Sequence, residues 1–85
     1  MDRVPHVEKK PVLAVIITIS GARIEGMVYV PLEERLIDEL ALPLRPYIAV
    51  GEPRITLPGS ETTVTPTVAF VPKEQVQVAW VVEEP

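Results

Sequence analysis

The stretch VLAVIITISGARIEGMVYV, residues 12–30, decides the fold. Its first part, Val12–Ser20, is dominated by β-branched residues, and its last part, Arg23–Val30, alternates apolar and polar side chains. Both patterns are typical of β-strands. Between them, Ser20-Gly21-Ala22 has the composition of a tight turn. The stretch therefore predicts a β-hairpin.

The two strands of this hairpin differ in how their faces are composed. The first strand is apolar on both faces, which is typical of a strand that is central in a sheet or covered on both sides. The second strand has a clear inward and a clear outward face, since side chains alternate along a strand. Its expected inward residues are Ile24, Gly26, Val28 and Val30, and its expected outward residues are Arg23, Glu25, Met27 and Tyr29.

Gly26 and Pro31 have structural meaning in the second strand. Gly26 falls on the inward face, where a missing side chain allows strong coiling or the close approach of a neighbour. Pro31 cannot donate to a strand ladder and is expected to end the strand. Residues 32–42 then predict a short helix with an apolar stripe, which is able to cover an open barrel end as a lid. The stripe consists of Leu32, Leu36, Ile37 and Leu40.

The rest of the chain predicts three more strands. They are Tyr47–Val50, with a possible edge continuation at Arg54–Leu57, then Thr62–Val71, with a bulge or edge at Pro66, and Val76–Val82. A one-turn 3₁₀ connector is expected at residues 72–75. The predicted fold is mainly β: a small five-stranded, partly open barrel with one short helix between strands two and three. Residues 1–11 are expected to form a flexible N-terminal tail, and residues 12–85 a single barrel domain.

Composition restricts the partners of this chain. It has 85 residues, no cysteine and a formal net charge of −4 at pH 7, which excludes disulfides and thiolate metal sites and argues against nucleic acid. Hydrophobic residues make up 47% of it, and its mean hydropathy is +0.25. In so small a domain the surplus apolar surface favours a partner subunit, so we expect a homo-oligomer. No signal peptide pattern is visible, and the longest apolar run, Val12–Ile19, is too short to span a bilayer, which predicts a cytoplasmic protein.

The inventory of catalytic residues is poor. The one histidine, His6, falls in the expected tail, and a Ser/His mechanism needs a base beside its hydroxyl. No convincing set of zinc ligands and no glycine-rich phosphate loop is present. We therefore expect no enzyme activity, no metal and no cofactor.

A group of carboxylates in residues 25–39 offers two interpretations. Glu34 and Asp38, four residues apart on one helical face, are able to ligate a hard cation or act as an acid/base pair. Alternatively, Glu33 and Glu34 lie in the first helical turn, where negative charge suits the helix dipole, and Arg35 neutralises Asp38 or Glu39. The second interpretation makes them the solvated side of the helix, and whether Glu34 and Asp38 bind a cation stays open.

The aromatic residues and one methionine are the candidates for contact with a partner. Met27 and Tyr29 lie on the outward face of their strand, either exposed or covered by the helix. Trp80 and Phe70 are expected to be core or interface anchors. The candidate interaction residues are Met27, Tyr29, Tyr47 and Trp80, and the structural residues are Gly26, Pro31, Leu36 and Leu40.

Two motifs carry a resemblance to a known family. R-I-E-G (residues 23–26) is followed by Pro31, R-L-I-D-E-L (35–40) and Y-I-A-V (47–50), and the chain later reads V-A-F-V-P-K-E-Q-V-Q-V (68–78). Together they resemble a family of small bacterial proteins of unknown function with the pattern R-x-x-I-x-G-x-x-x-x-P, then R-L-x-D-x-L. The arrangement also looks like the Sm-like (SH3-type) barrel. The resemblance implies a compact barrel that forms rings or other oligomers through its edge strands, with no established activity.

The leading functional hypothesis is a non-enzymatic, homo-oligomeric β-barrel module for assembly or protein interaction, in an unknown process. The alternative is an Sm-like single-stranded nucleic-acid-binding protein that uses Arg23, Arg45 and Arg54 with Tyr29 or Tyr47. The chain departs from RNA-binding Sm proteins in an acidic turn at residues 51–53 and in a helix that follows the second strand, whereas Sm proteins carry theirs before the first, so nucleic acid is the weaker hypothesis. Small-molecule binding in the barrel mouth has no signature beyond the carboxylates, and a hydrolase or metalloenzyme ranks last.

Overall fold

The structure, a computed structural model, describes residues 8–42 and 45–83. These residues form strands that build one sheet, with a short helix and a 3₁₀ turn between them. In chain order the elements are β1 (Lys9–Thr18), β2 (Arg23–Pro31), α1 (Leu36–Ala41), β3 (Tyr47–Thr56), β4 (Thr63–Val64), β5 (Val68–Pro72), η1 (Lys73–Gln75) and β6 (Val76–Glu83).

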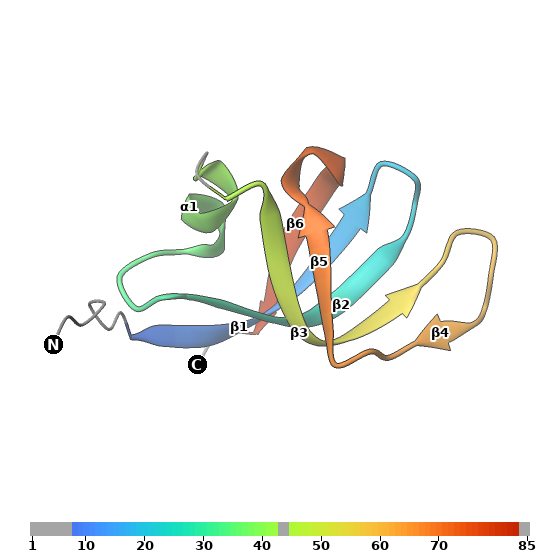
Figure 1. The fold of residues 1–85 in the computed structure, drawn as a ribbon, viewed down its shortest axis with the longest axis horizontal. Coiled ribbons are helices and arrows are strands. Elements are labelled where there is room, and N and C mark those ends of the chain that lie inside the picture. The colour runs from blue at the N-terminus through green and yellow to red at the C-terminus, as the bar shows by residue number, and fades with distance from the viewer. Residues whose placement is uncertain (1–7, 43–44, 84–85) are drawn as a thin grey trace, which may run out of the picture.

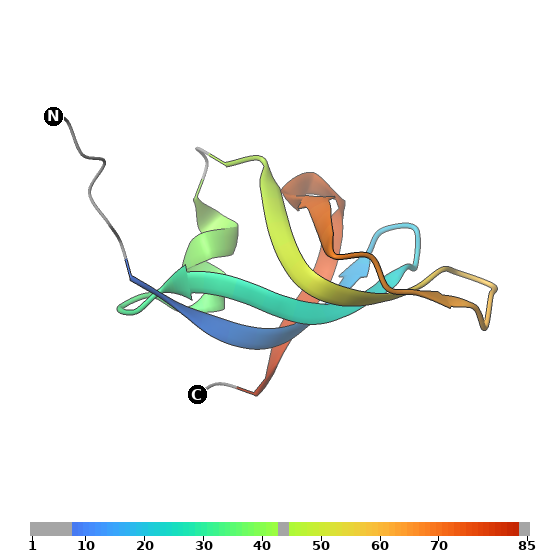
Figure 2. The same cartoon turned by 60° about the horizontal axis from the view of Figure 1, so that its bottom comes forward.

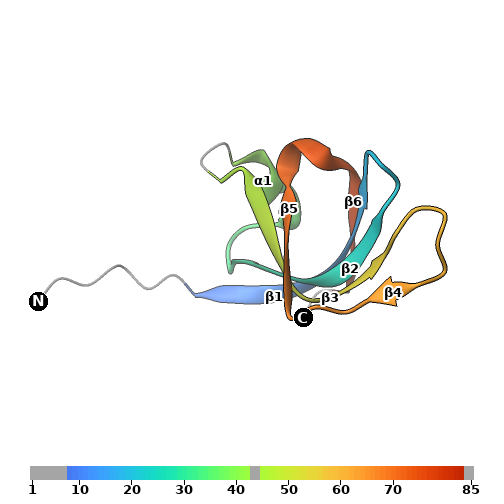
Figure 3. The same ribbon diagram turned by 45° about the vertical axis from the view of Figure 1, so that its right-hand side comes forward.

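The sheet is antiparallel, and β1 is central in it. The strand order is β4-β3-β2-β1-β6, and β5 pairs with the other half of β3. Figure 1 shows the sheet coiled into an open barrel. In Figure 3, β5 and β6 border the gap in this barrel, and η1 joins them at one end. The expected architecture is confirmed: mainly β, partly open, with one short helix between the second and third strands.

The strand count is six instead of five because the predicted strand 62–71 is divided. Its two pieces, β4 and β5, pair with different halves of β3, and Pro66 lies in the unpaired segment between them. Proline has no N–H for a ladder, so the chain leaves the sheet there. β3 itself is continuous across Pro53, with Glu52 at a φ of 46° and a register shift against β2. This is the bulge that the glycine and proline of residues 51–53 predict.

The inner face of the coiled sheet carries the core. Side chains from β1, β2, β3 and β5 meet there with one leucine of α1, which confirms the expected inward and outward faces of β2. The buried cluster consists of Val12, Ala14, Ile16, Ile24, Val28, Val30, Leu36, Ile48, Val50 and Val71. Val15, on the other face of β1, is also only 1% exposed. The prediction that the first strand is central in the sheet or covered on both sides is confirmed in its first form, since β1 lies between β2 and β6.

Gly26 of β2 lies in close contact with β3. A Cβ added to it would lie 2.6 Å from Cγ1 of Val50, 2.9 Å from the carbonyl oxygen of Gly51 and 3.0 Å from Cα of Pro53. Two of these three atoms are backbone and have no rotamer to change. The position therefore requires glycine for close packing, as the sequence predicted.

The helix is shorter than predicted. It begins at Leu36 instead of Leu32, because Arg35 is extended (φ −112°) and its N–H donates to Oδ2 of Asp38 at 2.8 Å. That bond satisfies one of the free donors at the helix start. Leu36 joins the core and Leu40 packs against it, but Leu32 and Ile37 are 50% and 63% exposed. The predicted four-residue stripe is therefore wrong at Leu32 and Ile37.

The N-terminal boundary also differs from the prediction. β1 begins at Lys9, since Lys9, Lys10 and Pro11 pair with Pro31, Val30 and Tyr29 of β2. Pro31 is the last residue of β2, as expected. This end of the hairpin extends beyond the neighbouring strands as a two-stranded ribbon (Figure 2). Residues 1–7 of the predicted tail, including His6, lie outside the described residues.

Candidate interaction surface

Met27 and Tyr29 lie on the outer face of the sheet, opposite the core. Met27 pairs with Leu13 of β1, and Tyr29 pairs with Pro11. Directly paired residues of antiparallel strands share a face, so all four side chains lie on one side of the ribbon. Tyr29 is 53% exposed. Because α1 packs on the opposite face through Leu36, the alternative in which the helix covers Met27 and Tyr29 is wrong.

Trp80 belongs to the same outer face. It pairs with Val15 of β1, which alternates with Leu13 along an uninterrupted register and therefore points the same way. Glu83 of β6 pairs with Leu13 and, with Pro11, Leu13 and Met27, lines a shallow pocket of about 150 Å³. The structure thus brings Met27, Tyr29 and Trp80 onto one face of three adjacent strands.

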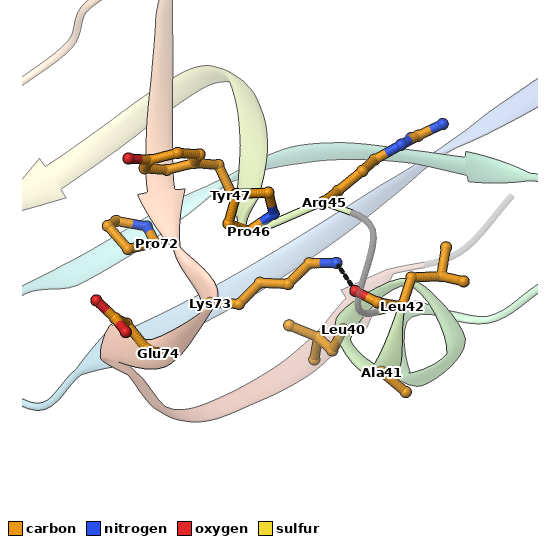
Figure 4. A pocket seen from close by; sticks show the side chains of 9 residues that line it. All are labelled: Leu40, Ala41, Leu42, Arg45, Pro46, Tyr47, Pro72, Lys73 and Glu74. Atoms are coloured by element: carbon orange, nitrogen blue, oxygen red, sulfur yellow. Dashed lines mark hydrogen bonds between the residues drawn. The ribbon is translucent and has the colours of Figure 1, made fainter.

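Tyr47 is separate from that group. It lies at the start of β3, in a groove of about 370 Å³ between α1 and the β5–η1 junction (Figure 4). The groove is lined by Leu40, Ala41, Leu42, Arg45, Pro46, Tyr47, Pro72, Lys73 and Glu74. The predicted set of four interaction residues is therefore divided between two places.

The cations of the Tyr47 groove hold the helix. Nζ of Lys73 donates to the carbonyl oxygens of Glu39 and Leu42 at 2.7 and 2.8 Å. Both carbonyls belong to the C-terminal end of α1, and that of Glu39 also accepts the N–H of Leu42 at 3.3 Å. Nη1 of Arg45 lies 3.5 Å from Oε1 of Glu39, which is buried. Both cations stabilise the position of α1, so the groove has a structural role already.

A second groove lies between α1 and β6. It has a volume of about 300 Å³, and apolar residues of α1 form one wall while β6 forms the other. Its lining consists of Arg35, Leu36, Ile37, Leu40, Ala79, Trp80 and Val81. Sequence reasoning missed this groove, because the strand order that places β6 at a sheet edge next to α1 is not visible in the hydrophobic pattern.

The two edge strands on either side of the open barrel expose large apolar side chains. On β5, Phe70 is 67% exposed, and on β6, Trp80 is 44% exposed. The prediction that Phe70 and Trp80 are core or interface anchors therefore loses its core alternative. Val68, Val78, Val81 and Val82 on the same strands are also exposed. This array is larger than the scattered single apolar residues of an ordinary surface.

The carboxylates do not assemble into a site. Glu33 and Glu34 precede α1 instead of forming its first turn, so Glu34 and Asp38 do not share a helical face. Asp38 accepts the N–H of Arg35 and lies 3.6 Å from Nε of that residue. Within residues 8–42 and 45–83, no group of three or more His, Cys, Asp or Glu residues is arranged to hold a metal ion.

The arginines of the nucleic-acid hypothesis lie beside carboxylates. Nη1 of Arg23 is 3.2 Å from Oε1 of Glu25, and Arg54 pairs with Glu25 across the β2–β3 ladder. Arg45 faces Glu39 in the Tyr47 groove. Phosphate binding needs positive charge that is not already neutralised, so these positions offer little to a nucleic acid.

Comparison with known proteins identifies no relative. No protein-family model matches the chain, and neither a curated protein nor a solved structure matches it significantly. In the described part of the chain, no helix is long and apolar enough to cross a membrane.

Proposed function

We propose that this chain is a non-enzymatic β-barrel module that assembles with copies of itself. The observation that carries the proposal is the apolar surface of the edge strands, where Phe70 is 67% and Trp80 44% exposed. Aromatic side chains of this kind dominate the energetics of interfaces when they are covered. In a chain with 47% hydrophobic residues, contact with a second subunit buries exposed apolar surface without any change in the fold.

The strand connectivity supports a finer proposal, that the fold is an Sm-like (SH3-type) barrel of the small bacterial family named above. A β1–β2–β3 meander, a last strand that returns to β1 and a 3₁₀ turn before that last strand are compatible with it. Nothing in this proposal assigns a biological process. Nucleic-acid binding is the weaker alternative, since Arg23 and Arg45 each contact a carboxylate.

Light scattering coupled to size-exclusion chromatography tests the proposal. We expect a mass that is a multiple of the 9.4 kDa chain and that falls only on strong dilution. A strict monomer over the whole accessible concentration range would contradict assembly. The same samples, titrated with a single-stranded oligonucleotide at low salt, test the alternative, because binding to phosphate strengthens as salt is removed.

A further inference from the structure

The outer edge of β6 lacks the features that protect edge strands. Edge strands are normally blunted by proline, by lysine or by being very short. β6 reads VQVAWVVE over eight residues and contains neither proline nor lysine. At the other sheet edge, β4 has two residues, and β5 is preceded by Pro66 and ends at Pro72. Of the two edges, β6 is the one built to accept another strand.

The side chains of β6 are exposed on both sides of the strand. Val78, Trp80, Val81 and Val82 are 48, 44, 39 and 50% exposed. Trp80 shares the outer face with Val15, while Val81 pairs with Ala14, whose side chain points to the core. A strand added along the edge therefore covers apolar surface on both faces, in addition to forming main-chain hydrogen bonds.

The groove between α1 and β6 adds apolar surface beside this strand. Its volume is about 300 Å³, and its far wall is α1, which presents Ile37 at 63% exposure. A stable interface needs about 800 Å² from each partner, more than one strand edge supplies. Contact between the added strand and α1 across the groove increases the buried area toward the value that a stable interface needs.

We propose that this added strand is β6 of a second copy, antiparallel to the first, about a two-fold axis that passes near Ala79 and Trp80. The inference rests on the proposed self-assembly and names its interface. The described length of β6 carries one charge, Glu83. In the antiparallel arrangement Glu83 lies opposite residues 75–77 of the partner, which are two glutamines and a valine. A parallel arrangement would place like charges side by side, which destabilises a strand pair.

The two-fold arrangement also limits the size of the assembly. Each β6 edge is used once, and the edges that remain are those of β4 and β5, which proline and short length protect. Because an isologous interface closes on itself, the assembly stops at two subunits. Pairing of β5 with β6 of a neighbour would instead be head to tail and would give rings or filaments.

Single-cysteine variants locate the axis, since the natural chain has no cysteine. Directly opposed residues of antiparallel strands have Cα atoms about 4.5–5.5 Å apart, within the range of a disulfide. On mild oxidation we expect the residue on the axis, Ala79→Cys or Trp80→Cys, to form a covalent dimer, and Val76→Cys, whose two copies lie several residues apart along the paired strands, to form none. Val64→Cys, with 44% exposure on the opposite edge, is the matched control and should remain monomeric in denaturing electrophoresis.

Lysine substitutions measure the contribution of the edge. Val78→Lys should weaken dimerisation at least about tenfold, equivalent to ~1.4 kcal/mol, because a charged side chain disfavours strand addition. Val64→Lys should leave the dimer intact, and circular dichroism verifies that both variants fold. If Val78→Lys does not fold, the cysteine pattern decides alone.

The outcomes separate the inference from the proposed function. A monomeric natural chain overturns both. An oligomer that loses mass with Phe70→Lys but not with Val78→Lys, or that gives a covalent dimer from neither Ala79→Cys nor Trp80→Cys, overturns the β6 interface and leaves self-assembly standing. A covalent dimer from either of these cysteines, together with dissociation by Val78→Lys, supports the β6 interface.

Discussion

Strands β1 and β6 are neighbours in the sheet and have nearly the same apolar composition, yet one is buried and the other is not. In β1, Ala14, Val15 and Ile16 are each 1% exposed, whereas Val78 and Val82 of β6 are 48 and 50% exposed. β1 has β2 on one side and β6 on the other, while β6 has a partner on one side among the described residues. An apolar strand pattern therefore predicts that a strand is buried, but the strand order decides whether that burial occurs within a single copy of the chain.

The largest expected effect concerns Gly26, where β2 packs closely against β3. Gly26→Ala should lower the free energy of unfolding by about 3 kcal/mol, because its Cβ would lie 2.9 Å from a backbone oxygen that has no way to move aside. Urea unfolding at fixed concentration measures the change.

Gly51→Ala is the matched control for this substitution. Its Cβ would find its nearest neighbours at 3.6 and 3.7 Å, which is ordinary contact, and the change should cost less than about 1 kcal/mol. Equal stability of the two variants would mean that the backbone around Gly26 is not packed too tightly for a Cβ. The contrast between the tightly packed interior strands and the exposed β6 would then be weaker.

The second prediction compares the two strands directly. Val15→Ala should cost about 2 kcal/mol, the transfer term for the lost methyl groups plus a cavity, whereas Val82→Ala should cost less than about 0.5 kcal/mol in dilute solution. At high protein concentration the cost of Val82→Ala should grow, since mass action links stability to any interface that contains this residue. Urea midpoints at both concentrations test this, and a large cost for Val82→Ala at high dilution would contradict the exposure of β6.

Several parts of the fold were predictable from the sequence because patterns of neighbouring residues determine them. The hairpin, the two faces of β2, the role of Gly26 and the 3₁₀ turn before β6 all follow from alternation or from turn residues. The start of α1 was not, since Leu32 fits a helical spacing with Leu36. The bond from Arg35 N–H to Asp38 is what begins the helix later, and spacing alone contains no information about it.

The outer side depends on register and strand order, which the sequence does not state. Alternation along the second strand already predicted Met27 and Tyr29 on one outward face, whereas only the pairing of Val15 with Trp80 places Trp80 on that face as well. Tyr47 is also an aromatic strand residue, but it lies apart from that face, in the groove between α1 and the β5–η1 junction. The groove between α1 and β6 joins residues that lie far apart in the chain, such as Leu40 and Ala79, so no local pattern could reveal it.

The smallest expected effect tests whether Lys73 helps to hold α1 in place. Lys73 of η1 donates to the carbonyl oxygens of Glu39 and Leu42 and so links the β5–β6 connection to the end of α1. Lys73→Met keeps the length of the side chain but leaves both acceptors without this donor, at a cost of about 1 kcal/mol. Hydrogen exchange should show faster exchange of α1 amides, while those of β1 stay protected. Lys9→Met, at an exposed position, is the control and should change neither quantity. Unchanged α1 exchange in Lys73→Met would mean that the core contact of Leu36 and the pair of Arg45 with Glu39 hold α1 without Lys73.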